Sequence, residues 1–463
     1  MRTTAAPPTR SWAPAALALC ALLPALGISI ANVGLPAIAA DLGNSFAEVQ
    51  WVVIAYLLSV TTAIVGAGRL GDLTGRRRLL IGGTAVFTLA TLLCALAPNL
   101  PLLVAARALQ GVGAAAMMAL TMALVGDTVP AERTGRVMGL LGTMSAIGTA
   151  LGPALGGVLV AGFGWRSVFL VGVPLGVLAL VLVVRALPHT APGTALRRFD
   201  AAGTALLALT LGAYALAMTV DGGTWALGVA AGGLVLFVLV ERRAPAPLLD
   251  LSLLRDAAFT ASLTTNALVS TVMMTTLVVG PFHLSRALGL DPVLVGLVMS
   301  AGPVVAALTG VPAGRATDRF GTSAMVVVGL GGVLAGAAAL ALTPVSAGFP
   351  GYLLPLVVVT AGYAVFQAAN NTSVMKTAAA SRRGLVSGVL NLSRNLGLVT
   401  GASVMGAVFA SAAGDVTTAS ATDVARATHW TFAVAAVLVA GGLSAVVGVR
   451  WWTRSSRATR SPA

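Results

Sequence analysis

The chain has 463 residues, of which 57% are hydrophobic and 9% are charged, and its net charge is +14. Soluble domains carry about 25% charged residues, so this composition excludes a soluble enzyme, a disordered chain and a disulfide-rich secreted scaffold. The basic residues stand in short clusters between apolar runs, which argues against a nucleic-acid partner and favours loops that flank membrane spans.

Apolar runs of about 20 residues, the length that a helix needs to cross about 30 Å of hydrocarbon, recur along the whole chain. Backbone groups in lipid must bond within their own segment, so each run is expected to be an α-helix. The predicted fold class is an all-α polytopic membrane protein. Its fourteen predicted spans are 13–37, 49–68, 79–97, 101–125, 137–161, 165–187, 201–220, 224–240, 258–282, 293–313, 323–343, 351–374, 385–411 and 430–450.

The number of spans depends on residues 189–257, which would form a long soluble linker in a twelve-span protein. They contain two apolar runs joined by Asp221, Gly222 and Gly223, a tight-turn signal that favours fourteen spans. Of the 28 basic residues, 23 fall in loops on the side of the N-terminus and 3 in loops on the opposite side. Because basic loops stay in the cytoplasm, both termini are expected there.

Two patterns occur twice in the chain, which predicts an internal repeat. The motif that begins at Gly68 returns 246 residues later at Gly314, and the glycines that begin at Gly139 return 249 residues later. Two related halves around a central cavity are typical of transporters. The expected organisation is a tail over 1–12, a six-helix half over 13–187, a two-helix insert over 188–257, a six-helix half over 258–450 and a basic tail over 451–463.

The loop between the second and third spans reads GRLGDLTGRRR over residues 68–78. Its glycines permit a tight turn, and Asp72 can lie against a helix N-terminus beside the arginines; the alternative is a plain basic loop. The spacing resembles the G-x-L-x-D-x-x-G-R signature of the major facilitator superfamily. Along essentially its whole length, the chain resembles the fourteen-span drug:proton antiporters of that superfamily, which implies the major facilitator fold, with two inserted helices.

The resemblance implies that this loop and its repeat form a conformational latch. Asp72 is then expected against the start of the thirteenth span near Gly384, and Asp318 against the start of the fifth span near Gly135. The expected latch residues are Gly68, Asp72, Gly75, Arg76, Gly314, Asp318 and Gly321.

The fourth and fifth spans carry two further patterns. Arg107 begins a segment similar to the family's R-x-x-Q-G-x-G pattern, which implies a role in proton coupling; the alternative is an arginine that extends to the membrane surface. The fifth span matches the G-x8-G-x3-G-P-x2-G-G signature of antiporters, which marks exporters, although close helix packing would also use these residues. The matching residues are Gly139, Gly148, Gly152, Pro153, Gly156 and Gly157.

The first span departs from the family pattern, because Gly27 stands where an aspartate is usual, five residues before Asn32. None of the 14 acidic residues falls in the middle of a predicted span, although buried carboxylates usually carry the proton in such transporters. Asp72, Asp127 and Glu48, near span ends, are the remaining candidate carriers. The shortage of acids also makes a neutral or anionic substrate fit at least as well as a cation.

Polar residues within spans are the candidates for a substrate cavity, because amides in lipid need partners and face the bundle. Hydrogen bonding between helices is the alternative role for each of them. Met273 and Met274 could add adaptable apolar contacts or simply pack in the core. The candidates are Asn32, Asn266, Tyr363, Gln367, Asn370, Asn371, Asn391, Arg394 and, less centrally, Asn395.

These features predict a secondary active transporter of a bacterial cell membrane, a monomer that exports small amphiphilic compounds in exchange for protons. A facilitator or metabolite exporter without proton coupling is the alternative, motivated by Gly27. An enzyme is disfavoured because His189, His283 and His429 are separated and no acid–histidine cluster, zinc-ligand spacing or phosphate-binding loop is present. A channel or sensor is disfavoured by the repeat, and no cofactor or metal is expected.

Overall fold

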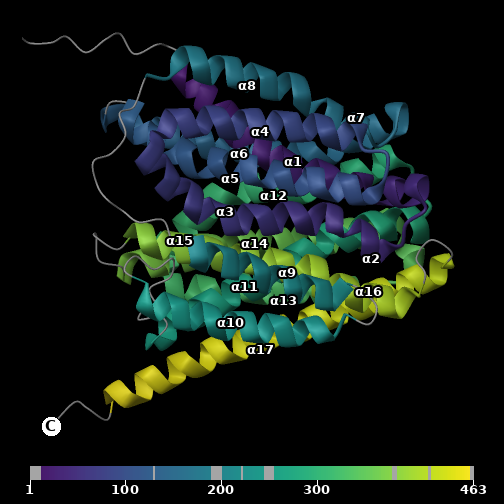
Figure 1. Ribbon diagram of the computed structural model, residues 1–463. Helices are drawn as coiled ribbons and strands as arrows, with labels where there is room; N and C mark the ends of the chain where they lie inside the picture. The colour runs from purple at the N-terminus through teal and green to yellow at the C-terminus, as the bar shows by residue number, and fades with distance from the viewer. Residues whose placement is uncertain are drawn as a thin grey trace, which may run out of the picture.

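The computed structural model describes residues 12–128, 131–188, 201–219, 223–244, 255–377, 383–414 and 419–458, apart from some side chains near helix ends. The described residues form helices that lie side by side, with no strand among them (Figure 1). Thirteen of these helices are long and apolar enough to cross a membrane, and a shorter apolar helix covers Ala202–Met218. The all-α polytopic fold is confirmed, whereas the count of fourteen spans and the side of the termini stay predictions.

The helices match the predicted spans in order and extend several of them. For example, the second predicted span ends at residue 68, whereas its helix continues to Thr74. The first part of the chain forms α1 (Ala13–Leu42), α2 (Phe46–Val49), α3 (Trp51–Thr74), α4 (Arg76–Leu96), α5 (Leu100–Thr128), α6 (Ala131–Phe163), α7 (Ser167–Leu170) and α8 (Gly172–Ala186).

The second part is preceded by two helices that correspond to the predicted insert, α9 (Ala201–Thr219) and α10 (Trp225–Arg243). The α11 helix continues into a π-helical turn, η2, and another π-helical turn, η5, joins α15 to α16. The remaining elements are α11 (Ala257–Phe282), η2 (His283–Ala287), α12 (Pro292–Phe320), α13 (Thr322–Leu342), η3 (Val345–Ala347), α14 (Gly348–Thr377), α15 (Arg383–Thr400), η5 (Gly401–Met405), α16 (Gly406–Ala413) and α17 (Ala421–Ala458).

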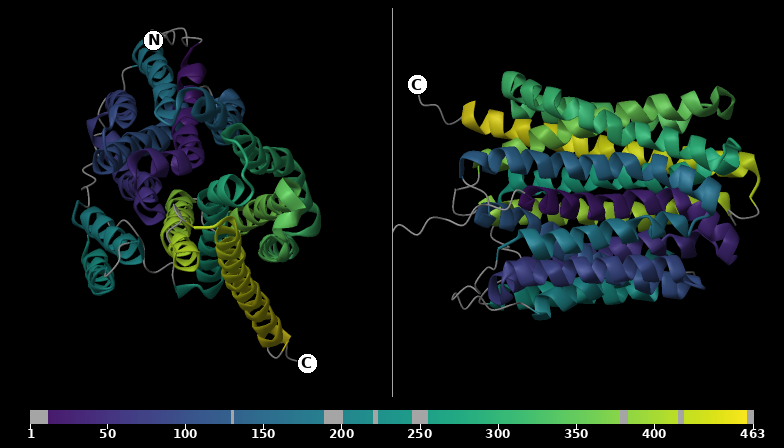
Figure 2. Two further views of the ribbon diagram at one scale, coloured as in Figure 1. Left: turned by 90° about the vertical axis from the view of Figure 1, so that its right-hand side faces the viewer. Right: turned by 90° about the horizontal axis from the view of Figure 1, so that it is seen from above.

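Seen along the helix axes, α1–α8 form one group and α11–α17 form another (Figure 2). The inserted pair α9 and α10 packs beside both groups. Leu207 and Leu211 of α9 are buried in a small apolar cluster with Leu58 of α3 and Leu396 of α15. The bundle has an N-terminal end, where α1 begins at Ala13, and a far end, where α1 finishes.

The two matching loops of the repeat have the same backbone geometry. Gly75 separates α3 from α4 at φ +97°, and Gly321 separates α12 from α13 at φ +85°. Residues with a Cβ rarely adopt positive φ, so glycine is needed at both sites. The amide of each glycine closes the preceding helix by donating to the residue four positions earlier, Gly71 or Thr317.

The glycines of the fifth predicted span and their repeats also occupy corresponding places. Gly148 of α6 lies against α1 and accepts a hydrogen bond at its carbonyl from Ser29 of α1 (3.1 Å). Its repeat, Gly397 of α15, lies against α11 and accepts from Thr271 of α11 (3.1 Å). The first long helix of each group, α1 or α11, therefore packs against the glycine that corresponds in the repeat, as the repeat predicts.

Candidate functional site

A cavity of about 440 Å³ lies between the two groups of helices, near the middle of the helices that line it. Its volume falls in the range of about 300–1,000 Å³ that drug-sized ligands occupy. Helices α1, α5 and α6 contribute from one group, and α11, α14 and α15 from the other. The lining residues are Ala21, Pro24, Ala25, Ile28, Met118, Thr121, Met122, Leu141, Ser145, Thr149, Met273, Met274, Leu277, Tyr363, Arg394 and Leu398.

The cavity wall is mostly apolar, with four methionines from opposite sides. Met118 and Met122 of α5 stand one turn apart, and Met273 and Met274 of α11 lie across from the first group. Methionine side chains are flexible and polarisable, so they adapt to ligands of different shape. This lining suits a family of amphiphilic molecules better than one rigid substrate.

Arg394 is the one charged residue among those that line this cavity in the described part of the chain. Its Nε atom is buried without a hydrogen-bond partner among the described residues. Tyr363 shares the cavity, and its hydroxyl accepts a hydrogen bond from Gln367 (3.0 Å), which leaves the hydroxyl proton available. The hydroxyl of Thr121 is also buried without a partner.

Several predicted cavity residues lie outside this lining and bond within or between helices. Asn266 donates from α11 to the carbonyl of Leu390 (3.0 Å), and Asn370 donates from α14 to the carbonyl of Ser262 (3.4 Å). Asn32 donates within α1 to Ile28 (2.8 Å). Asn395 is buried outside the lining, Asn371 is exposed, and the side chain of Asn391 lies outside the described residues.

Arg107 of α5 is fully buried within the first group of helices, at 0% exposure, so it does not extend to the membrane surface. Its guanidinium donates to the carbonyls of Val52 in α3 (2.8 Å) and Gly27 in α1 (3.1 Å), and to the side chain of Gln110. It also lies 4.3 Å from the ring centroid of Tyr56. Among the described residues, carbonyl oxygens and an aromatic face stabilise this charge in place of a carboxylate, and the Nη2 atom has no partner there.

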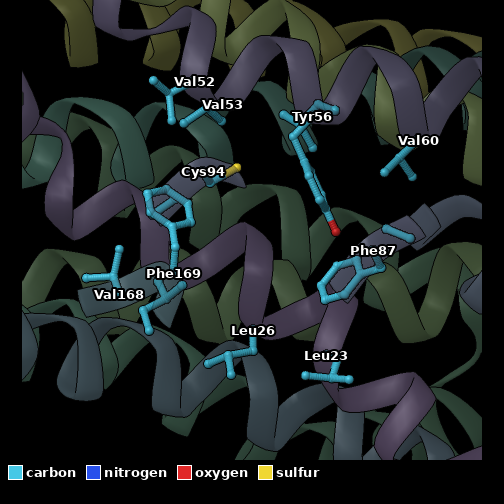
Figure 3. Packing of buried hydrophobic residues seen from close by; sticks show 14 of the residues in the cluster. Leu23, Leu26, Val52, Val53, Tyr56, Val60, Phe87, Cys94, Val168 and Phe169 are labelled. Atoms are coloured by element: carbon cyan, nitrogen blue, oxygen red, sulfur yellow. The ribbon is translucent and has the colours of Figure 1, made fainter. Parts of the chain in front are cut away.

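Tyr56 and Phe169, the two rings nearest this guanidinium, belong to a buried apolar cluster together with Phe87 and Leu23 (Figure 3). The hydroxyl of Tyr56 reaches across to α1 and donates to the carbonyl of Pro24 (3.0 Å). The three helices α1, α3 and α5 are therefore tied together near the middle of the bundle. This tie places Gly27 directly beside the guanidinium.

A small cavity of about 20 Å³ adjoins Gly27, with Thr91 and Gln110 among its lining residues. That volume holds about one water molecule. A methyl group added at Gly27 would lie 3.5 Å from Phe87 and 3.7 Å from the hydroxyl of Tyr56, which are ordinary contacts. The position therefore has room for a small side chain, although it holds glycine.

The glycine face of α6 packs against one helix from each group. A methyl group at Gly152 would collide with Ser29 of α1, and one at Gly157 would collide with the backbone oxygen of Pro292 and lie 3.1 Å from Gly296 Cα of α12. A methyl group added at Gly296 would in turn collide with the backbone oxygen of Pro153 in α6. Backbones therefore touch at the far end of the bundle, where two groups of helices meet.

Aromatic side chains also join the groups at the far end. Phe46 of α2 lies between Phe282 of α11, with ring centroids 4.6 Å apart, and Phe409 of α16, at 4.9 Å. Beside them, Gln50 is buried against Gly406, and its amide has no hydrogen-bond partner among the described residues. These contacts close the far end.

A family model described as Major Facilitator Superfamily matches residues 17–402. The chain belongs to this superfamily. The match begins in α1 and ends just after α15, so it includes helices of both groups, and it confirms the superfamily that the motifs indicate. Members of the superfamily move solutes across membranes, so this major facilitator chain is a multi-pass membrane transporter.

Two relatives illustrate the range of named transporters that resemble it. The multidrug efflux pump LfrA of Mycolicibacterium smegmatis is 32% identical over 417 residues, which cover 88% of this chain and 82% of LfrA. The riboflavin transporter RibZ of Clostridioides difficile is 31% identical over 388 residues, which cover 82% of this chain and 84% of RibZ.

A solved structure has the same fold. The bacterial homologue of the human lysosomal transporter Spinster, in an inward-facing and occupied conformation, superposes with a TM-score of 0.73 at 15% identity. The match covers 96% of this chain and 97% of that structure. At this identity the likeness concerns the fold alone.

The major facilitator structure describes the side chains of some predicted latch residues and proton carriers but not of others. Asp318 is exposed at the end of α12, whereas the side chains of Asp72 and Asp127 lie outside the described residues, as does Gly139. Glu48 lies at the far end, where it accepts from the amide of Ser45 (2.8 Å) and forms a capping box that begins α2. Its carboxylate therefore has a structural partner already.

Part of the cavity wall consists of residues that carry no polar signal in the sequence. Met118, Thr121 and Met122 of α5, and Ser145 and Thr149 of α6, line the cavity but are small or apolar residues of ordinary membrane helices. The repeat contained a signal that could have found them. Met118 and Ser145 stand 249 residues before Gln367 and Arg394, which is the offset of the repeated glycines, so they hold the matching positions of the first half.

Proposed function

We propose that this chain exports small amphiphilic compounds across a bacterial plasma membrane by alternating access. The cavity between the two groups of helices, closed toward the far end, carries the proposal. In this mechanism the N-terminal end, with its many basic residues, faces the cytoplasm, and a substrate enters the cavity from there. Rocking of one group against the other then opens the far end and releases the substrate outside.

Three observations support this proposal. The lining is apolar and rich in methionine, which suits varied amphiphiles. The glycines of α6 allow α1 and α12 to approach closely, so a single helix links both groups at the far end. LfrA, with which the chain shares 32% identity, is named a multidrug efflux pump.

Proton exchange is the proposed source of energy. Arg107 is the proposed coupling residue, because its buried charge is balanced by carbonyl dipoles and would respond to any acid that approached it. Asp72, Asp127 and Glu48 are the proposed carriers, and Glu48 would have to leave its capping box to act. Asp72 and Asp318 are proposed to form latches that close the cytoplasmic end when the far end opens.

A facilitator without proton coupling is the second candidate. It is favoured by one observation: neither the cavity lining nor the surroundings of Arg107 contain an acidic side chain in the described part of the chain. Such a protein would move its substrate only down a gradient. The fold and the cavity would serve both functions equally well.

Efflux from cells tests this proposal directly. Cells that lack their own efflux pumps are loaded with anionic, neutral and cationic fluorescent dyes, and dye loss is followed with and without the expressed transporter. We expect faster loss of at least one dye, and a protonophore should abolish the difference. No difference for any dye would contradict export, and a difference that persists with the protonophore would favour the facilitator.

A further inference from the structure

We propose that the central cavity selects small amphiphiles with an acidic group, and that Arg394 binds this group. The inference rests on the proposed function and names the substrate class of the same cavity. It begins from a charge imbalance. Arg394 supplies the one charge in the described lining, and no described acidic residue shares the cavity with it.

The guanidinium of Arg394 is available to a ligand. Its Nε atom is buried without a partner, and no hydrogen bond or ion pair links Arg394 to another described residue. A buried donor without a partner is costly, and a charged one more so, which makes an anion the natural complement. Guanidinium groups bind carboxylates, sulfonates and phosphates in a bidentate manner, which fixes the orientation of the bound group.

Further donors share the cavity with Arg394. Tyr363 already accepts a hydrogen bond from Gln367, so its hydroxyl has its proton free to donate. Thr121 presents a buried hydroxyl with no described partner. The cavity thus offers an acidic molecule one charged and two neutral donors in its wall, while the methionines and leucines contact the apolar body of the molecule.

A cationic substrate is a poorer fit to the same wall. The cavity offers it no described carboxylate, and Arg394 would repel it in surroundings of low dielectric constant. The aromatic ring of Tyr363 could attract a cation, but the free guanidinium in the same cavity opposes that attraction. The balance of charge therefore favours an acid.

Transport of a matched pair of dyes tests the inference. Fluorescein and its methyl ester share one skeleton and differ in the carboxylate, and rhodamine 123 adds a related cation. The purified full-length transporter is reconstituted in liposomes loaded with each dye, and release is measured below saturation against protein-free liposomes. The variants are Arg394→Gln, Arg394→Lys and, as a control for loss of an arginine, Arg286→Gln at the exposed far end.

We expect the wild type to move fluorescein faster than either other dye. Arg394→Gln should slow fluorescein about tenfold, the effect of losing one hydrogen bond to a charged group, and should change the ester less than twofold. Arg394→Lys should keep most of the fluorescein transport, and Arg286→Gln all of it. Because ester transport reports folding, a folded variant is recognised in the same assay.

Three results would overturn the inference. Transport of the ester and of rhodamine 123 without fluorescein would contradict it and leave the proposed export function standing. An equal loss of both fluorescein and its ester in Arg394→Gln, without recovery in Arg394→Lys, would assign Arg394 a structural role. If the wild type moved none of the three dyes, the inference and the proposed function would both fail.

Discussion

The closed far end depends on the contact between Gly157 of α6 and Gly296 of α12, and Gly157→Ala tests it. The added methyl group would collide with the backbone oxygen of Pro292 and lie 3.1 Å from Gly296 Cα. Overpacking of this kind costs about 1–3 kcal/mol. The cost applies only while the far end is closed, because opening separates α6 from α12.

The conformational equilibrium should therefore shift toward the state that is open at the far end. A difference of about 1–3 kcal/mol corresponds to a factor of about 5–150 in population. The intrinsic gain in helix stability from glycine to alanine is common to both states and cancels. Gly162→Ala is a matched control, because it lies on the same helix and a methyl group there meets nothing within 4 Å.

Thiol labelling from the outside measures the shift. A cysteine at Leu277, which lines the cavity, is exposed to a membrane-impermeant maleimide in intact cells. The native Cys20 and Cys94 are both buried, and variants without the new cysteine give their background. We expect labelling about tenfold faster in Gly157→Ala and unchanged in Gly162→Ala. Equal rates in the two variants would refute the far-end gate.

Three further predictions concern the charged groups. Gly27→Asp should place a carboxylate beside Arg107 and make transport more dependent on a pH gradient than Gly27→Asn does. Equal dependence in the two variants would show that position 27 takes no part in proton coupling. Arg107→Gln should lower the free energy of unfolding by about 1 kcal/mol, because two interhelical hydrogen bonds of about 0.6 kcal/mol each are lost. The exposed Arg426→Gln is the control and should leave the free energy of unfolding unchanged. Melting curves in detergent measure both variants, and equal stability of the two would contradict the hydrogen bonds assigned to Arg107. Asp72→Asn should reduce transport severalfold, and unchanged transport would contradict the proposed latch.

Much of the fold follows from hydropathy and the repeat. Runs near 20 residues predicted the long helices, and the matched glycines at 75 and 321 predicted two equivalent turns, since only glycine tolerates their positive φ. The segment around Ala202–Met218 fits less well, because its apolar stretch is short for a span. Helix ends were predicted less well than helix centres, because membrane helices continue past the apolar core into polar residues.

The cavity was only partly predictable. Tyr363 and Arg394 stand out because polar residues in a span need a reason, and the structure places both in the wall. Asn266 and Asn370 carry the same signal, but they bond across helices, since an amide satisfies a neighbouring carbonyl as readily as a ligand. Met118 carried no signal, because methionine is equally common in packed cores and in binding walls.

Arg107 shows where the sequence limits inference about mechanism. Its burial could be predicted from its place in a span, but its partners could not, because the Val52 and Gly27 carbonyls belong to other helices. The chain lacks the expected aspartate and keeps the arginine beside the same position.

The most direct test is transport by purified protein in liposomes with an imposed pH gradient, acidic on the side of the far end, and with the membrane potential clamped by potassium and valinomycin. The gradient should drive fluorescein uphill, from the side of the N-terminal end to the acidic side. Collapse of the gradient should stop the movement, and protein-free liposomes should show none. Movement that only follows the dye gradient, at the same rate with or without the pH difference, would contradict proton exchange and identify a facilitator.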